Sequence, residues 1–243
     1  MNPDRGTDGG CMRVIRLGLP AALVLCMTGQ AAGQDGAIPE NLSMETYSLE
    51  DRFRINLAGR PTVTATTWTS LPDVTYPARI YSVENGLNRD SLTVVDMTEA
   101  EKRHAEQRKN CTGGVRCTEG WDYDVRGAMD YAAWRLTQKY TKLTYIGWDV
   151  QDRVEGRTLR FTNANGTQTT AAIHMHENRL YIVESSQPES EPARGFVSQS
   201  LQFIDGQGNL IRYRSVYANG WPAPPRVEQE GNADFRQRNI NAR

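Results

Sequence analysis

The 243-residue chain has few cysteines, no apolar run long enough for a membrane helix and almost no net charge. Its formal net charge of -1 is not the basic balance expected of a nucleic-acid-binding protein. The apolar run Leu17–Met27 is about half as long as the roughly 20 residues that span a bilayer. We therefore expect no nucleic-acid partner and no stable membrane span.

Motifs of the common catalytic sites are also missing from the sequence. It has no nucleophile elbow, phosphate-cradling glycine loop, metalloprotease helix or dinucleotide-binding fingerprint. Asp149, Asp152 and Glu155 cluster around a predicted turn, and we interpret them as solubilising rather than catalytic. We therefore expect no catalytic residues and no cofactor.

Residues 1–33 are predicted to be a signal peptide. Arg13 and Arg16 form a short positive region, Leu17–Met27 forms the apolar core, and residues 31–33 supply the small side chains that a signal peptidase accepts. This arrangement predicts export, so that the mature chain is periplasmic or secreted. Removing residues 1–33 takes away three arginines and two aspartates, which leaves a net charge near -2.

The first residues do not fit the signal pattern. Asp4 and Asp8 are unusual ahead of an apolar signal core, so we interpret residues 1–11 as an over-extended start and Met12 as the true one. Lipidation of Cys26 is an alternative, but Leu25 stands where a lipobox carries a small residue.

Two of the four cysteines, Cys111 and Cys117, remain after the signal is removed. We predict a disulfide between them, because an exported protein folds in an oxidising compartment and Gly113 and Gly114 let so short a loop turn back. A metal pair and a redox pair are the alternatives, although metal sites favour closer spacing and more ligands, and redox pairs favour C-x-x-C.

Hydrophobic periodicity predicts an α+β domain over residues 44–216, preceded by a linker (34–43) and followed by a flexible tail (217–243). Alternating apolar positions and turn residues such as Asn85-Gly86 predict a mostly antiparallel sheet. Strands are expected at 53–57, 63–68, 76–83, 92–97, 143–150, 156–162, 169–176, 180–184 and 209–213.

Helices are expected at 99–110, at 122–140 and around 196–204. The second carries an apolar stripe, and Asp122 or Asp124 is expected to cap its start. The stripe consists of Val125, Met129, Ala132, Ala133, Leu136 and Tyr140. The first is almost wholly charged, and we interpret it as a solvated helix; a basic docking surface is the alternative.

The order of these elements resembles the Mog1/PsbP-type fold, particularly small exported bacterial members of uncertain function. Residues 50–61 (EDRFRINLAGRP), 77–81 (PARIY), 179–183 (RLYIV) and 196–201 (FVSQSL) carry the resemblance. It covers about residues 44–214 and implies an α/β/α sandwich, with helices on both faces of a sheet and no required cofactor. Relatives by fold bind protein partners, but the charged segment around the cysteines departs from the pattern, so no partner is transferred.

His174 and His176 are predicted to lie on one face of a strand, with Ile173 and Met175 facing the core on the other. Two imidazoles on one face can begin a copper or zinc site.

No third ligand is identifiable for this pair, and the candidates are Glu177 and His104. The simpler interpretation is that the two histidines lie at a solvated hairpin end.

Trp121, Trp134 and Trp148 gather around the main helix and the strand after it. We predict that at least two of them complete the core, because large aromatics bury much area. An exposed tryptophan beside Tyr140 and Tyr145 would instead mark a contact patch.

These patterns predict an exported, soluble, non-catalytic protein that binds or assists another envelope component. A metal-binding protein or enzyme using the His174/His176 face is the alternative, and a small-molecule binding module is a third possibility. Neither the partner nor the oligomeric state follows from the sequence.

Overall fold

The computed structural model describes residues 43–113, 117, 120–219 and 223–227. The predicted signal peptide, most of the predicted linker and residues 228–243 of the predicted tail lie outside this part of the chain. Among the described helices, none is long and apolar enough to cross a membrane.

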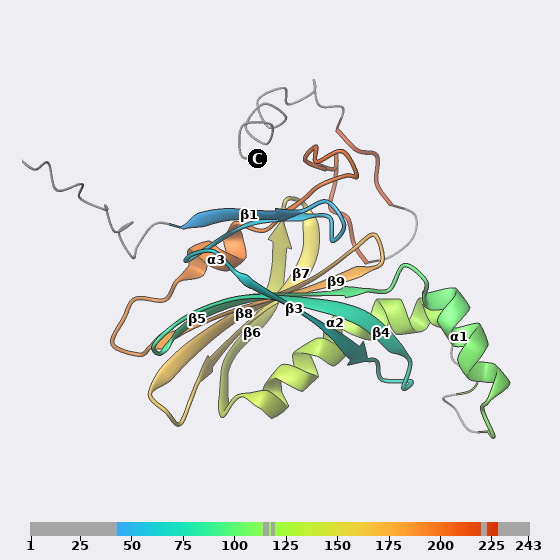
Figure 1. Cartoon of the computed structure of the whole chain (residues 1–243), viewed down its shortest axis with the longest axis horizontal. Coiled ribbons are helices and arrows are strands. Elements are labelled where there is room, and N and C mark those ends of the chain that lie inside the picture. The colour runs from blue at the N-terminus through green and yellow to red at the C-terminus, as the bar shows by residue number, and fades with distance from the viewer. Residues whose placement is uncertain (1–42, 114–116, 118–119, 220–222, 228–243) are drawn as a thin grey trace, which may run out of the picture. The chain divides into compact units, whose positions relative to one another are not determined.

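A seven-stranded antiparallel sheet lies at the centre of the domain (Figure 1). It joins two meanders, which contribute β3 (Thr62–Thr69), β4 (Thr75–Asn85) and β5 (Asn88–Asp96), and then β6 (Lys142–Gln151), β7 (Val154–Thr162), β8 (Thr167–His176) and β9 (Arg179–Pro188). The strand order is β3-β4-β5-β9-β8-β7-β6, so the meanders meet where β5 pairs with β9. The predicted strands of both meanders are confirmed to within a few residues.

Tight turns connect the hairpins, and one of them is the turn predicted at Asn85-Gly86. Gly86 has a φ of +60° between β4 and β5, a conformation that glycine adopts without a steric penalty. The turn between β8 and β9 uses Glu177 and Asn178, which take φ values of +48° and +56° without any glycine. Two consecutive residues with positive φ match the twist of the flanking strands.

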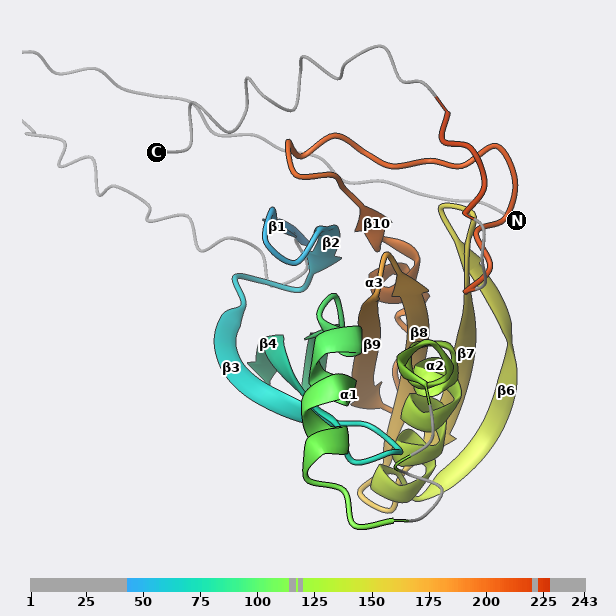
Figure 2. The ribbon, with the colours of Figure 1, turned by 90° about the vertical axis from the view of Figure 1, so that its right-hand side faces the viewer.

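Two helices cover one face of the sheet, α1 (Ala100–Lys109) and α2 (Trp121–Lys139). Figure 2 shows the sheet curving around α2, with β3 at one edge and β6 at the other. The predicted stripe is confirmed in α2, where Val125, Met129, Ala132, Ala133 and Leu136 are buried. Tyr140 follows the helix and packs partly buried against this core.

The predicted cap of α2 is wrong. Gly120 occupies the N-cap position and provides no side-chain hydrogen bond, and Asp122 is exposed. Asp124 points into the core instead, where it accepts hydrogen bonds from Ser70 and Tyr76.

A smaller three-stranded sheet covers the opposite face, together with the short helix α3 (Gly195–Gln199). It consists of β1 (Met44–Ser48), β2 (Phe53–Leu57) and β10 (Gln202–Phe203). The half-buried strand predicted at 53–57 is confirmed, since Phe53, Ile55 and Leu57 are all fully buried. The fold is therefore α+β, with two helices on one face of the main sheet and a second sheet plus one helical turn on the other.

Two predictions in the C-terminal part are wrong. The helix around 196–204 ends at Gln199, because Leu201 and Phe203 are buried at strand spacing and β10 pairs with β2. Phe196, assigned to the buried side of that helix, is 45% exposed. Residues 209–213 form only isolated bridges, and they do not join the main sheet.

Part of the predicted tail contacts the domain. Tyr217 is buried, and its backbone bonds to Arg153 and Glu155 beside β7. Val227 donates a backbone hydrogen bond to Arg212, so the described residues 223–227 run beside 212–214.

Candidate ligand-binding groove

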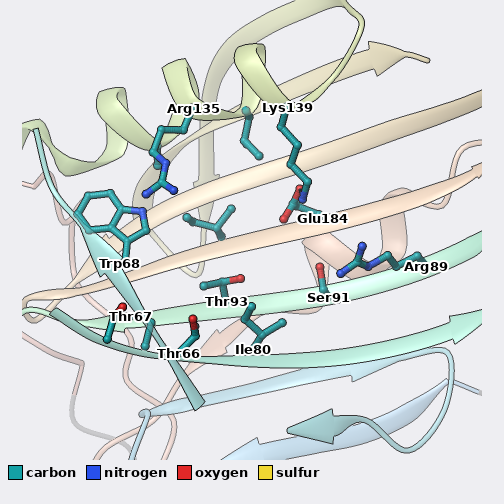
Figure 3. Close-up of a pocket in the computed structure, with 14 residues that line it drawn as sticks. Thr66, Thr67, Trp68, Ile80, Arg89, Ser91, Thr93, Arg135, Lys139 and Glu184 are labelled. Carbon is teal, nitrogen blue, oxygen red and sulfur yellow. Dashed lines mark hydrogen bonds and ion pairs between the residues drawn. The ribbon is translucent and has the colours of Figure 1, made fainter. Parts of the chain in front are cut away.

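A groove with a volume of about 450 Å³ lies between α2 and the β3-β4-β5-β9 half of the sheet. Figure 3 shows Arg135 and Lys139 extending from α2 toward Trp68, Thr93 and Glu184 on the strands. Its remaining walls consist of Thr66, Thr67, Ala78, Ile80, Arg89, Ser91, Ala132, Leu136 and Ile182.

Strand alternation explains why these side chains meet. Trp68 pairs with Tyr76, and Thr66 pairs with Ala78, so both β3 residues face the same side of the sheet as α2. The pairs Ile80–Thr93 and Thr93–Ile182 extend this face across β4, β5 and β9. Small and polar side chains on these strands leave space that α2 does not fill.

Trp68 and Arg135 form one end of the groove. The guanidinium carbon of Arg135 lies 5.7 Å from the ring centroid of Trp68 and 6.0 Å from that of Tyr131. Tyr131 also stacks on Trp134, with centroids 5.5 Å apart. Within the described residues no carboxylate forms an ion pair with Arg135, so its charge is balanced only by the aromatic faces and a long bond to the Thr69 carbonyl.

The other end of the groove contains a buried carboxylate. Glu184 is 8% exposed and accepts hydrogen bonds from Lys139 Nζ at 2.6 Å and from the Tyr140 hydroxyl at 2.7 Å. Burial first, and then the Glu184 charge, raise the pKa of Tyr140 above its usual value, so the hydroxyl remains a donor. Arg89 also lines this end, and it pairs with the exposed Glu84.

These charges favour an anionic ligand. Three cations line the groove against one carboxylate, and Glu184 already neutralises Lys139. Arg135 can therefore offer its guanidinium edge to a carboxylate, sulfonate or phosphate group, while Trp68 and Ile80 offer apolar surface.

The predicted histidine pair lies on the opposite face of the sheet. His174 and His176 are fully buried beneath Phe203, and the pair is not at a solvated hairpin end, as the simpler interpretation had it. The three-stranded sheet and the segment around Tyr213 cover them, which a local sequence pattern does not reveal. Ile173 is buried in the helix-side core, so the predicted division of faces is confirmed.

Burial keeps both imidazoles neutral. Loss of hydration lowers the pKa of His176 to about 3, helped by the charges of Arg226 and Arg179. The same cause lowers the pKa of His174, although Asp149 opposes it from 3.9 Å. His176 Nε2 lies 2.7 Å from the Tyr213 hydroxyl.

The predicted metal ligands are not brought together with a third. Across the described part of the chain, no group of three or more His, Cys, Asp or Glu side chains is arranged to hold a metal ion. Glu177 pairs with Arg226, and His104 belongs to α1, which covers the other face of the sheet. The metal site therefore stays a prediction.

Sequence reasoning missed a buried polar network around Asp124. Its Oδ2 atom accepts from Ser70 Oγ at 2.8 Å and Tyr76 Oη at 2.7 Å, and lies 2.9 Å from His104 Nε2. His104 is buried, so the prediction that this helix is solvated on all sides is wrong for α1. The signal for this contact was a lone histidine within a charged helix, which does not name its partner.

The predicted disulfide is confirmed. Cys111 and Cys117 are bonded, with Cα atoms 5.8 Å apart, between α1 and α2.

The acidic cluster of Asp149, Asp152 and Glu155 is partly buried, whereas we had interpreted it as solubilising. Asp149 accepts a hydrogen bond from Thr158, and burial raises the pKa of Asp152.

The tryptophan prediction is wrong. Trp121 packs partly buried against the core, but Trp134 is 54% and Trp148 61% exposed. Trp134 lies on the side of α2 away from its buried stripe, and Trp148 lies on the edge strand β6. Trp148 is exposed, but the pairing with β7 places Tyr145 on the other face of β6. Tyr140 packs partly buried against the core, so the patch of the alternative interpretation is not formed by these three side chains.

Compared with models of protein families and with curated protein sequences, the chain matches none of them. The resemblance to the Mog1/PsbP-type fold stays a prediction that rests on the residues quoted above.

Proposed function

We propose that the chain is an exported, non-catalytic binding protein whose groove takes an anionic group attached to an apolar body. The observation that carries the proposal is Arg135, which lies over Trp68 without a carboxylate partner in the described chain. A ligand anion would complete the contacts of this guanidinium, and the tryptophan would contact the adjoining apolar part.

Export to the periplasm or the exterior is the second half of the proposal. The signal-like residues 12–33 and the Cys111–Cys117 disulfide support it by independent routes, since the bridge needs an oxidising compartment. In such a location the ligand is either a small molecule or an acidic group on another envelope component.

An aromatic dye pair tests the groove. Anilinonaphthalene sulfonate carries the required anion, and its uncharged parent phenylnaphthylamine does not. We expect the sulfonate to bind with enhanced fluorescence, and Arg135→Gln to weaken its binding about tenfold with little effect on the parent. Arg160→Gln is the matched control, because Arg160 lies over Tyr145 outside the groove. Equal losses in both variants, or equal binding of both dyes to the unchanged protein, would contradict the proposal.

The two possible carriers of the anion give different results in cells. A photoreactive amino acid at Thr67, which lines the groove, should cross-link to a protein when an envelope component carries the group. A small-molecule ligand gives no protein adduct, while the dye result stays the same.

Metal binding or metal-dependent chemistry at His174 and His176 is the second candidate. Two buried nitrogens, His174 Nε2 and His176 Nδ1, have no hydrogen-bond partner, and unpaired buried polar atoms are rare. Thermal unfolding with excess zinc or copper tests it. A metal-dependent rise in the unfolding temperature that His174→Ala abolishes supports the candidate, and no rise removes it.

A further inference from the structure

The edge strand β6 has an unusual surface for the end of a sheet. None of its ten residues is buried, and its apolar residues are exposed on both faces. Leu143 is 37%, Tyr145 47%, Ile146 55% and Trp148 61% exposed. An edge strand also presents backbone donors and acceptors to any strand that approaches, so an apolar edge of this length attracts pairing.

The opposite edge of the same sheet differs. Five of the eight residues of β3 are threonine, and Val63 is its exposed large aliphatic residue. Such a polar edge needs no cover, whereas β6 does. The two edges therefore differ in the surface that they present to a neighbouring strand.

We propose that β6 pairs antiparallel with β6 of a second copy of this chain, which joins two seven-stranded sheets into one. Pairing identical strands creates a closed two-fold interface in which each contact occurs twice. The two-fold axis must be perpendicular to the sheet, so only residues on the same face can stand opposite each other.

The pairing of β6 with β7 defines these faces. Leu143, Ile146 and Trp148 stand opposite Phe161, Leu159 and Arg157, which places all three on the helix-covered side. Thr144 is the extra residue of a bulge and has no partner of its own.

A register centred on Ile146 matches the helix-side face to itself. Ile146 then stands opposite Ile146 of the second copy, and Leu143 stands opposite Trp148 on both sides of the axis, when Thr144 is again counted as the bulge. Aliphatic and aromatic pairs of this kind stabilise antiparallel neighbours.

The same register matches opposite charges on the other face. Lys142 stands opposite Asp149 twice, once at each end of the interface. Lys142 has no ion-pair partner among the described residues, and the Asp149 side chain is a third exposed. Tyr145 stands opposite Gly147, over which the hydroxyl end of the Tyr145 ring of the same strand lies.

Shifting the axis by one position to Gly147 removes this match. Asp149 would then face Tyr145, and Lys142 would face Gln151. The charge pattern therefore selects the register centred on Ile146, and it also selects a second copy as the partner, because one strand supplies both halves of each pair.

Charge reversal tests both the partner and the register. Sedimentation velocity should show a dimer for the unchanged protein. Lys142→Glu and Asp149→Lys should each raise the dimer dissociation constant about tenfold, because each places like charges opposite one another twice. Mixing the two variants should restore a dimer, since both contacts are then between opposite charges. A monomer at all concentrations of the unchanged protein overturns the proposal, and it would leave β6 to a strand of another protein.

A matched pair of edge substitutions covers the case in which Asp149→Lys fails to fold. Ile146→Lys should dissociate the dimer, because it places two lysines together on the axis. Val63→Lys, at the equally exposed position on β3, should leave the dimer intact. Circular dichroism at matched concentrations confirms folding of each variant. Dissociation by Val63→Lys but not by Ile146→Lys would place the interface at β3 and contradict the proposal.

Discussion

The two faces of the central sheet hold their buried polar groups in different ways. On the helix-covered face, Asp124 accepts hydrogen bonds from several side chains, and the neighbouring groove is open and lined with charges. On the opposite face, His174 and His176 are sealed beneath aromatic rings, and the Asp149 carboxylate lies 3.9 Å from His174 Nε2. The comparison shows that one face carries an open groove lined with charges, whereas the other encloses its polar groups away from water.

Removing an aromatic ring from the sealed face should cause the largest loss of free energy of unfolding. Phe203 is fully buried, with centroids 4.5 Å from His176 and 5.3 Å from Tyr181. Phe203→Ala should lower the free energy of unfolding by about 4 kcal/mol, because it leaves a cavity in a closed core. Urea unfolding measures this loss. Phe196→Ala is the matched control, since that ring is 45% exposed and its removal should cost well under half as much.

The helix-covered face should depend on its carboxylate. Asp124→Ala leaves the buried donors of Ser70 and Tyr76 without an acceptor, and we expect a loss of about 3 kcal/mol in urea unfolding. Asp122→Ala, two residues away and exposed, should change stability by less than about 0.5 kcal/mol. Similar effects of the two substitutions would mean that the network contributes little.

Acid should act on the sealed face. In the unfolded chain the His176 side chain gains its proton as the pH falls through 6.5. In the folded state burial lowers its pKa to about 3. The unfolded state therefore binds more protons in this window, and lowering the pH destabilises the fold by up to about 1.4 kcal/mol per pH unit for this group.

Unfolding titrations of the unchanged protein and of His176→Gln between these two pH values measure that slope. The variant should lose less stability as the pH falls, because glutamine does not titrate. Parallel curves would show that His176 is not buried as a neutral group. Comparing two proteins with the same carboxylates removes the contribution of other titrating groups.

The smallest effect is expected within the groove itself. Glu184→Gln removes the carboxylate that neutralises Lys139, so the groove becomes more positive. Binding of anilinonaphthalene sulfonate should tighten about threefold at low ionic strength, and the gain should fade as salt is added. Glu191→Gln, whose carboxylate pairs with Arg194 outside the groove, should leave dye binding unchanged. Weaker binding by Glu184→Gln would mean that Lys139 needs its partner to reach the ligand.

Local patterns predicted the features whose causes are local. The stripe of α2, the turn at Gly86 and the shared face of His174 and His176 each follow from spacing along one element. The disulfide between Cys111 and Cys117 followed from a short loop and the predicted compartment.

Features that depend on distant segments could not be predicted. Strand spacing places two histidines on one face, but it does not reveal that Phe203 covers them. Trp68, Arg135 and Glu184 lie on three separate elements, so no window of sequence contains the groove. Trp148 looked like a core residue because β6 was not recognised as an edge, a property of the whole strand order.

The strand order also determines when the fold can be completed. The two meanders meet where β5 pairs with β9. Leu92 of β5 pairs with Val183 of β9, although α1, α2 and three strands lie between them in the sequence. Forming this pairing closes a long loop, which makes the topology slow to fold compared with a simple series of hairpins. A chain that emerges from its N-terminus leaves β5 unpaired on one side until β9 has appeared. The edge of β5 must therefore stay unpaired until then, and an unpaired strand edge exposes the nascent protein to aggregation.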